Sequence, residues 1–488
     1  MKPSFRNSCV VLILATILGA DLANVGPGVT SSAWADEGGD DGGGDDGGDD
    51  GDDRDDRDDR DDDDGRSGSS GRSGSQNSPA GQVDRFLRNI ERSIFGRNAP
   101  PRAPAGSPAP RQVEDLAPDE IVVFNLNLGD QTVLQAEGYS VLDTIALTTL
   151  TQEITRLQIP QGTALAAARD RVRALPSGQT ADFNHFYRAE QETLTPEPVA
   201  LPACRHENCR AWDSINWPRA SLALGSCAVT VPIGMIDTGI NTGHEIISGA
   251  DLEVLRLADQ ALEPSKAIHG TAVASVLIGN DQSRVPGLIR EARVVAVDAF
   301  GRVGSDERAD LVSVLRGLDL LAGRDVRVIN LSIAGSDNLL LRDTVNTLVE
   351  ERGITIVAAA GNGGPRADPV FPSGYGNVIA VTAVDTGGRI YRRAQRGAHL
   401  DMAAPGVNLL AATSVRGARL KTGTSFAVPY VTATAAVLLS IDPSKTPTDV
   451  ATWLTANVRD LGQAGQDDIF GWGMLQAQDV CNAQRTQP

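Results

Sequence analysis

Apolar runs of strand length alternate with helical segments along the second half of the chain, from about residue 229 onward. The strand candidates are apolar at nearly every position, which is typical of strands covered on both faces in a parallel sheet. We therefore predict a three-layer α/β domain with a mainly parallel sheet over residues 229–482. The expected strands are 229–236, 294–297, 326–333, 355–360 and 378–384, and the expected helices are 271–278, 310–321, 339–351 and 426–440.

A smaller pattern lies before this domain, between residues 119 and 189. Its expected strands and helices follow one another in the order β-α-β-β-α-β, which predicts a ferredoxin-like α+β unit. Residues 190–203 carry three prolines and are expected to form an exposed linker, within a segment 190–228 that leads into the larger domain. The expected strands of the small unit are 121–124, 141–150, 154–159 and 183–187, and its expected helices are 131–137 and 164–175.

The N-terminal part of the chain does not have the composition of a globular domain. Residues 1–35 have a basic start, an apolar run and a final Ala33-Trp34-Ala35, the pattern of a cleaved secretory signal peptide; an uncleaved membrane anchor is the alternative. Residues 36–82 are mostly Asp, Gly, Arg and Ser. They are expected to be disordered, because they cannot bury enough apolar surface to offset the entropy of ordering. Residues 83–118 are expected to hold one helix and a proline-rich linker.

The negative charge of the chain is concentrated in this region. The 488 residues carry a formal net charge of −19 at pH 7, and −15 of it falls between Asp36 and Asp64. The remainder is nearly balanced and has no basic patch or nucleic-acid-binding motif, so we expect no nucleic-acid partner. We expect an exported monomer, extracellular or periplasmic, with no membrane partner after the signal is removed.

Export also changes how the cysteines are interpreted. Removal of the signal leaves Cys204, Cys209, Cys227 and Cys481, and an even number outside the cytosol indicates disulfides. Three pairings are open; we favour Cys204 with Cys209 and Cys227 with Cys481, which would join the start and end of the large domain. A zinc site is the alternative, but no second CxxC-type pair or histidine cluster accompanies these cysteines.

Three loops of the large domain carry the residue types of nucleophilic catalysis. Asp237 ends the first expected strand, His269 begins one helix and Ser425 begins another. Open parallel sheets place their sites in loops at the carboxyl ends of the strands, so these residues are expected to meet. A serine hydroxyl needs a base to take its proton, histidine suits that task, and a buried carboxylate orients the histidine. Each residue alone would more often be a helix cap.

The motifs around these residues resemble those of the subtilisin-like serine peptidases, peptidase family S8. Segments 234–239 (GMIDTG), 269–274 (HGTAVA) and 423–429 (GTSFAVP) are similar to that family's three signatures, and 357–363 (VAAAGNG) resembles the stretch with its oxyanion asparagine. The resemblance covers about residues 229–475. It implies a secreted serine endopeptidase with a triad of Asp237, His269 and Ser425, in which Asn362 and the Ser425 N–H stabilise the oxyanion.

The same resemblance implies a substrate groove for protein or peptide substrates. One wall would be Ser332, Ile333, Ala334 and Gly335 and the opposite edge Gly301–Ser305, so that a peptide adds as a strand between them. Gly361 would adjoin the oxyanion site. Val370 aligns where a glycine often floors the primary specificity pocket, which predicts a preference for small side chains.

The small unit at 119–189 resembles the family's propeptide in position, size and pattern. It would be the chain's own intramolecular inhibitor, released by cutting between Ala189 and Cys204. Segment 244–246 (HEI) lacks the Pro-Asp pair of a common calcium site, so the sequence does not support a structural calcium ion, which stays an open alternative. We expect no required cofactor and assign no metal ligand.

Other functions fit these residues less well. Asp-Thr-Gly occurs at Asp237 and at Asp385, as an aspartic peptidase requires, but that fold is nearly all β and leaves the His and Ser motifs unexplained. An α/β-hydrolase needs its histidine after its serine, whereas the last histidine is His399. A catalytically inactive peptidase fold that binds partners is the alternative from a different class, and the intact set of four site residues argues against it.

Overall fold

The computed structural model describes residues 114–190, 206–219, 227–257 and 262–482. The chain divides into two units, 1–105 and 106–488, and all described residues belong to the second. The expected signal peptide, acidic segment and proline-rich linker lie outside the described residues. So do Cys204 and most of the expected linker before the large domain.

The small unit has its six elements in the expected order. In the described residues its strands pair antiparallel in the order β2-β3-β1-β4. Its own core joins Ile121 and Val123 of the sheet to Leu134 and Val172 of the two helices. The elements are β1 (Leu116–Phe124), α2 (Leu128–Ala136), β2 (Ser140–Leu147), β3 (Gln152–Gln158), α3 (Leu165–Arg173) and β4 (Asp182–Ala189).

The large domain is built on a mainly parallel sheet, which confirms the predicted fold class. Within the described residues the sheet has nine strands in the order β18-β19-β15-β14-β13-β11-β5-β8-β6, and every pair is parallel except β18 with β19. The strands are β5 (Ile233–Asp237), β6 (Leu252–Arg256), β8 (Val294–Asp298), β11 (Val328–Leu331), β13 (Thr355–Ala359), β14 (Ile379–Val384), β15 (Met402–Pro405), β18 (Val458–Arg459) and β19 (Met474–Leu475).

Successive residues of the central strands enter cores on opposite faces of this sheet. Met235 and Ala296 belong to the core that contains α6, α9 and α10, whereas Ile236 and Val297 belong to the core that contains α7 and α8. This two-sided burial explains why the strands are apolar throughout. The helices are α6 (His269–Ile278), α7 (Leu311–Ala322), α8 (Leu339–Asn346), α9 (Thr424–Ile441) and α10 (Pro447–Ala456).

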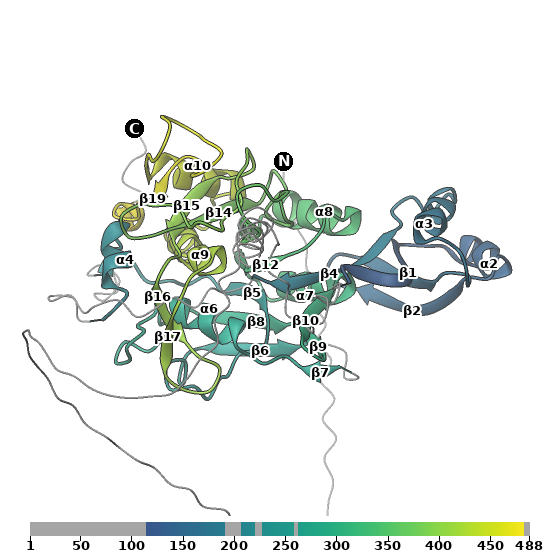
Figure 1. The fold of residues 1–488 in the computed structure, drawn as a ribbon, viewed down its shortest axis with the longest axis horizontal. Helices are drawn as coiled ribbons and strands as arrows, with labels where there is room; N and C mark the ends of the chain where they lie inside the picture. The colour runs from purple at the N-terminus through teal and green to yellow at the C-terminus, as the bar shows by residue number, and fades with distance from the viewer. Residues whose placement is uncertain (1–113, 191–205, 220–226, 258–261, 483–488) are drawn as a thin grey trace, which may run out of the picture. The chain divides into compact units, whose positions relative to one another are not determined.

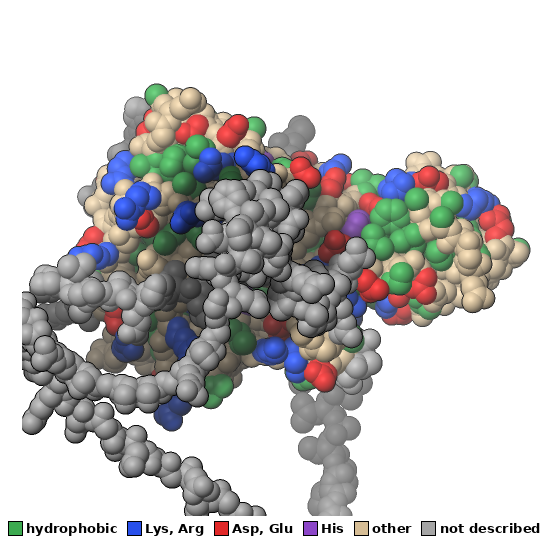
Figure 2. All heavy atoms as spheres, in the orientation of Figure 1, with side chains coloured by type: hydrophobic (Ala, Val, Ile, Leu, Met, Phe, Trp, Pro, Cys, Tyr) green, Lys and Arg blue, Asp and Glu red, His purple; other side chains and the backbone are tan. Residues whose placement is uncertain are grey.

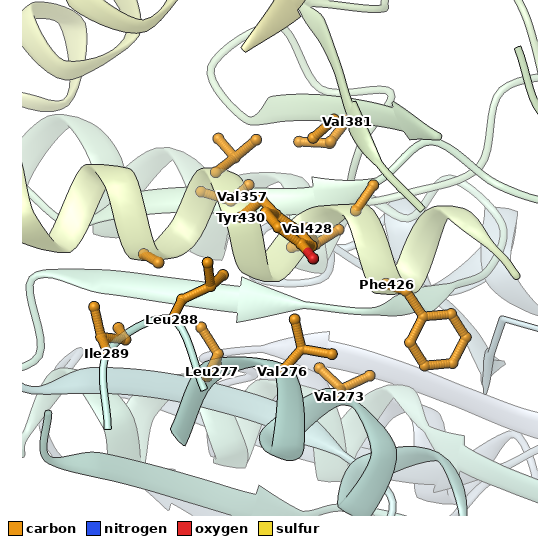
Figure 3. Packing of buried hydrophobic residues seen from close by; sticks show 14 of the residues in the cluster. Val273, Val276, Leu277, Leu288, Ile289, Val357, Val381, Phe426, Val428 and Tyr430 are labelled. Atoms are coloured by element: carbon orange, nitrogen blue, oxygen red, sulfur yellow. The ribbon is translucent and has the colours of Figure 1, made fainter. Parts of the chain in front are cut away.

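Helix α9 runs through the centre of the first core. Figure 3 shows Val273 and Val276 of α6 below Phe426, Val428 and Tyr430 of α9. Its length and composition would allow α9 to cross a membrane, but 89% of its apolar window is buried inside the protein. Its apolar character is therefore explained by its position between α6 and the sheet.

A second sheet joins the small unit to the large domain. In the described part of the chain it continues from β4 to β10 (Asp306–Asp310), β9 (Gly301–Val303) and β7 (Glu263–Pro264), while β12 (Ile333–Ala334) also pairs with β4. In Figure 1, β4 lies where the small unit meets the large domain, beside the labels of β12 and β10. A strand of the small unit thus pairs with strands of the large domain.

A disulfide between Cys227 and Cys481 closes the large domain across 254 residues of sequence. This confirms one of the two favoured pairings, and Cys209 is also disulfide-bonded. On the face shown in Figure 2, basic and acidic side chains of the described residues are interspersed. Elements that the sequence did not predict include β6, β15, α10, the helix α4 (Cys209–Ser214), the hairpin β16 (Leu409–Ala412) and β17 (Ala418–Lys421), and a 3₁₀ turn (Val480–Asn482). The end of the expected helix 339–351 is a π-helical turn (Thr347–Glu351).

Candidate active site

Asp237 and His269 form a buried pair at the carboxyl end of β5. The His269 Nδ1 lies 2.8 Å and 3.0 Å from the two carboxylate oxygens of Asp237. Both residues are at most 5% exposed. The Thr238 N–H also donates to Asp237 Oδ1 at 2.7 Å, which fixes the carboxylate. A carboxylate on Nδ1 sets the histidine tautomer so that Nε2 can act as a base.

The start of α6 is held against the loop after β5, and this contact requires Gly270. The Gly270 N–H donates to Thr238 Oγ1 at 2.8 Å. A Cβ at Gly270 would lie 2.3 Å from the Thr238 carbonyl oxygen, far inside contact distance. The glycine after His269 therefore lets the helix approach closely enough for the histidine to reach Asp237.

Ser425 lies in the first turn of α9, and an unusual hydrogen bond holds its carbonyl. Pro429 has no N–H, so it cannot make the helical bond to the carbonyl four residues earlier, which belongs to Ser425. The Ser332 hydroxyl supplies the missing donor at 3.1 Å. Ser332 was predicted as part of the groove wall, and the structure also gives it this supporting role.

Ser332 belongs to a buried chain of polar side chains between α9 and β11. The Asn330 amide donates to Ser332 Oγ at 3.1 Å, and Thr432 Oγ1 donates to Asn330 Oδ1 at 3.2 Å. All three side chains are fully buried. A satisfied network of this kind fixes the position of the helix start relative to the sheet.

Asn362 follows β13 and faces the same helix start. Its Oδ1 accepts hydrogen bonds from the Thr424 N–H at 3.0 Å and from Thr424 Oγ1 at 3.2 Å. With the oxygen held in this way, the amide nitrogen lies next to Gly423, where a Cβ would be 3.2 Å from Nδ2. The N–H groups in the first turn of a helix lack acceptors within the helix, so the Ser425 N–H is a second candidate donor to an oxyanion.

The Ser425 hydroxyl is fully buried and makes no hydrogen bond within the described part of the chain. The next residue, Phe426, has its ring centroid 5.8 Å from that of His269, so the histidine and the serine lie on neighbouring segments. Catalytic hydrogen bonds are often loose before a reacting substrate is bound. The structure therefore brings the four predicted residues to one place without a formed Ser–His hydrogen bond.

Strand β4 lies between β12, in the wall that the sequence predicted, and β10, and it pairs antiparallel with both. Ile333 pairs with Ala189 and Ala334 pairs with Arg188 on one wall. On the other side Tyr187 pairs with Ala309, and Phe186 pairs with Asp310 of β10. The prediction of Gly301–Ser305 as this edge was wrong by one strand, because Gly301 lies in β9, which turns back to pair with β10 and β7.

Tyr187 fills a space that only a glycine leaves open. Its side chain is fully buried, and a Cβ on Gly335 would lie 2.3 Å from the tyrosine ring. The tyrosine hydroxyl also lies 3.3 Å from the Ser336 carbonyl oxygen, to which it donates. The absent side chain of Gly335 thus leaves the space that the Tyr187 ring occupies.

Glu190 is the last described residue of this segment and is buried against the site. The sequence placed it in an exposed linker, which was wrong: its exposed fraction is 9%. Its N–H points to the Ser332 carbonyl at 3.5 Å, and its Oε2 accepts from the Asn362 N–H at 2.9 Å. Loss of hydration on burial raises the pKa of the Glu190 carboxyl to about 7. No local sequence signal identified it, since its burial depends on strand pairing with another domain.

The small unit makes a second set of contacts with the large domain, at the helices α7 and α8. Asp319 of α7 accepts from the N–H groups of Thr149 and Leu150 at 2.9 Å and 2.8 Å. Asp182 accepts from the Leu339 N–H at 3.0 Å and so caps α8 from outside. An acceptor from the small unit therefore satisfies a helix N-terminus of the large domain.

Gly361 and Val370, two residues that the sequence assigned to substrate binding, lie side by side. A Cβ on Gly361 would be 3.0 Å from Val370 Cγ2 and only 1.4 Å from Gln395 Oε1. Gln395 is 2% exposed, and the sequence did not single it out. In the residues that the structure describes, no group of three or more His, Cys, Asp or Glu side chains is arranged to hold a metal.

Comparison with known proteins agrees with this arrangement. Residues 229–473, half of the chain, match the subtilase family, peptidase S8. The minor extracellular protease Epr of Bacillus subtilis (strain 168) is 27% identical over 370 residues, which are 73% of this chain and 53% of that protein, so the chain spans about half of its length. Subtilisin BL of Lederbergia lenta is 31% identical over 254 residues, covering 51% of this chain and 89% of that protein.

A solved structure supports the same fold. Fervidolysin from Fervidobacterium pennivorans, a keratinolytic enzyme related to subtilisin, superposes with a TM-score of 0.64 at 18% identity, over 75% of this chain and 61% of that chain. The match of motifs, sheet order and sequence relatives leads to one assignment. The chain belongs to the subtilase family of subtilisin-like peptidases.

Proposed function

We propose that this protein is a serine endopeptidase that is exported as a self-processing precursor, with Asp237, His269 and Ser425 as its catalytic triad. The observation that carries the proposal is the buried His269–Asp237 pair beside the start of α9, next to a groove already filled by a strand. That strand has the main-chain pairing that a peptide substrate would need. Membership of the subtilase family supports the same chemistry.

The proposed reaction is amide hydrolysis through an acyl-enzyme. Ser425 Oγ attacks the substrate carbonyl carbon while His269 Nε2 takes the hydroxyl proton, and Asp237 stabilises the resulting imidazolium. Asn362 Nδ2 and the Ser425 N–H bind the oxyanion. His269 then gives its proton to the departing amine, and water repeats the sequence to release the acid and restore the serine.

The precursor role of the small unit is supported by its contacts. It fills the groove with β4 and caps α8 with Asp182, so a substrate and this unit would exclude each other. Export is supported by the sequence pattern of residues 1–35 and by a relative that is an extracellular protease. We propose that the unit inhibits the enzyme until it is cut away.

A fluorophosphonate reagent tests the activated serine directly. Intact mass is measured on the full chain, on Ser425→Ala and on the control Ser305→Ala, which changes an exposed serine in the turn before β10. We expect one adduct on the wild-type chain and on the control, and none on Ser425→Ala. If the folded chain cuts itself free of the small unit and still forms no adduct, or if Ser425→Ala is labelled equally, the proposed nucleophile is wrong.

A further inference from the structure

The register of β4 places one residue of this chain at the cutting position. Arg188 pairs with Ala334 and Ala189 pairs with Ile333, so Glu190 comes next, with its N–H toward the Ser332 carbonyl. The hydroxyl of the same Ser332 holds the carbonyl of Ser425. Glu190 is therefore the described residue of this segment whose main chain lies beside the proposed nucleophile.

The side chain of Glu190 enters a site where Asn362 donates hydrogen bonds from both its main chain and its side chain. Its Oε2 accepts the Asn362 N–H at 2.9 Å, and the residue is 9% exposed. Both donors are neutral amides, and burying a charged carboxylate is costly unless an opposite charge pairs with it. A neutral carboxyl or a carboxamide presents a carbonyl oxygen that can accept these hydrogen bonds without burying a charge.

We propose that the primary specificity site of this enzyme takes the neutral carboxyl of Glu or the carboxamide of Gln, that Glu190 fills this site in the precursor, and that self-cleavage occurs on the carboxyl side of Glu190. This inference rests on the proposed function. It replaces the small-side-chain preference predicted from Val370 with recognition by the Asn362 N–H.

The charges around Glu190 agree with a neutral form at mildly acidic pH. Burial raises the pKa of its carboxyl to about 7, while the Asn362 N–H and the nearby charges of His269 and Arg393 act in the opposite direction. A raised carboxyl pKa means that docking of this residue is strongest at low pH and weakens as the pH rises through about 7. Binding of Glu190 in this site therefore depends on pH through the titration of its own carboxyl group.

The chemistry of the cut follows the proposed mechanism. Ser425 Oγ bonds to the carbonyl carbon of Glu190, and the peptide bond to the next residue breaks as His269 protonates its nitrogen. Water then cleaves the ester, leaving a free α-carboxylate on Glu190 and a restored serine. No other reactant is required.

Self-processing of the full chain is the first test. The wild type, Glu190→Gln and the control Glu153→Gln, an exposed glutamate of β3, are followed by intact mass and N-terminal sequencing from about pH 5.5 to about pH 8. With a pKa of about 7 the neutral fraction of Glu190 falls about tenfold over this range. We therefore expect the ratio of the self-cleavage rates, wild type over Glu190→Gln, to fall about tenfold over the same pH range. Taking the ratio cancels the pH dependence of the catalytic groups that both proteins share.

The control should follow the wild type at every pH. A first cut elsewhere than after Glu190, or an identical pH profile for the wild type and Glu190→Gln, would overturn the proposal. If Glu190→Gln does not fold, as judged by circular dichroism, the peptide test below decides the question with the wild-type enzyme alone.

The second test uses peptides with the sequence Tyr-Arg-Ala-X before the scissile bond, where X is Glu, Gln, Ala or Phe. We expect the processed enzyme to give its highest kcat/KM with Gln throughout, and a Glu/Gln ratio that falls more than tenfold from about pH 5.5 to about pH 8. Faster cleavage after Ala or Phe, or a constant Glu/Gln ratio, refutes the specificity. A fluorophosphonate adduct on Ser425 in such a case would leave the proposed function intact, whereas loss of both adduct and cleavage would overturn both.

Discussion

The hydrogen bond from Ser332 to the Ser425 carbonyl gives a prediction whose size follows from the structure. Ser332→Ala removes the donor to that carbonyl and the acceptor of the Asn330 amide, and all of these groups are buried. A buried polar group left without a partner costs about 1–3 kcal/mol. We therefore expect Ser332→Ala to lower the free energy of unfolding by about 2–4 kcal/mol.

Pro429 provides an internal check on this explanation. Replacing it with alanine restores the main-chain N–H that an ordinary helix would direct at the Ser425 carbonyl. In the Pro429→Ala background, Ser332→Ala should then cost about 1–2 kcal/mol less than in the wild type, because the carbonyl keeps one donor. The two substitutions are thus predicted to be coupled.

Urea unfolding followed by tryptophan fluorescence measures these differences. All variants carry Ser425→Ala, which prevents self-digestion and leaves the carbonyl unchanged. The control Ser305→Ala, at an exposed turn, should change the free energy of unfolding by less than about 0.5 kcal/mol. If Ser332→Ala lowers the free energy of unfolding equally in both backgrounds, the Ser332 hydroxyl does not compensate for the missing N–H of Pro429.

Three further predictions concern the large domain. Gly270→Ala should abolish peptide hydrolysis with the fold retained by circular dichroism, because its Cβ would lie 2.3 Å from the Thr238 carbonyl oxygen; normal kcat/KM would contradict this reasoning. Burial raises the pKa of Asp298 to about 6, so the charged form of this side chain opposes folding. In urea unfolding, the free energy of unfolding of Asp298→Asn minus that of the wild type should rise by up to about 3 kcal/mol between about pH 4 and pH 7. A difference that stays constant over this range would refute the reasoning. Replacing Cys227 and Cys481 together with serine should lower the free energy of unfolding by roughly 2–5 kcal/mol, since the bond closes 254 residues, and an unchanged urea midpoint would show that the pair adds no stability.

Much of the fold could be predicted because it depends on local patterns. The continuous apolar runs that became β5, β8, β13 and β14 identified a buried parallel sheet, and the β-α-β-β-α-β order of the small unit was also confirmed. The short strands β7, β9 and β10 were not predicted, because their pairing depends on neighbours far away in the sequence.

The candidate site shows the same division. The motifs around Asp237, His269, Asn362 and Ser425 were visible in the sequence, since each needs specific residue types next to one another. The role of Ser332 beneath Ser425 was not visible, because it appears only when β11 and α9 are packed together.

The sequence by itself determined the family and the fold class, since the motifs around Asp237, His269 and Ser425, the glycines beside them and the alternation of strands and helices are all local features. Only the tertiary structure decided what fills the groove. Glu190 looked like part of a polar linker, and pairing of β4 with β12 buries it at 9% exposure against Asn362. Burial of a carboxyl depends on surfaces supplied by distant segments, and for that reason its raised pKa and its place beside Ser425 could not be derived from its neighbours in the chain.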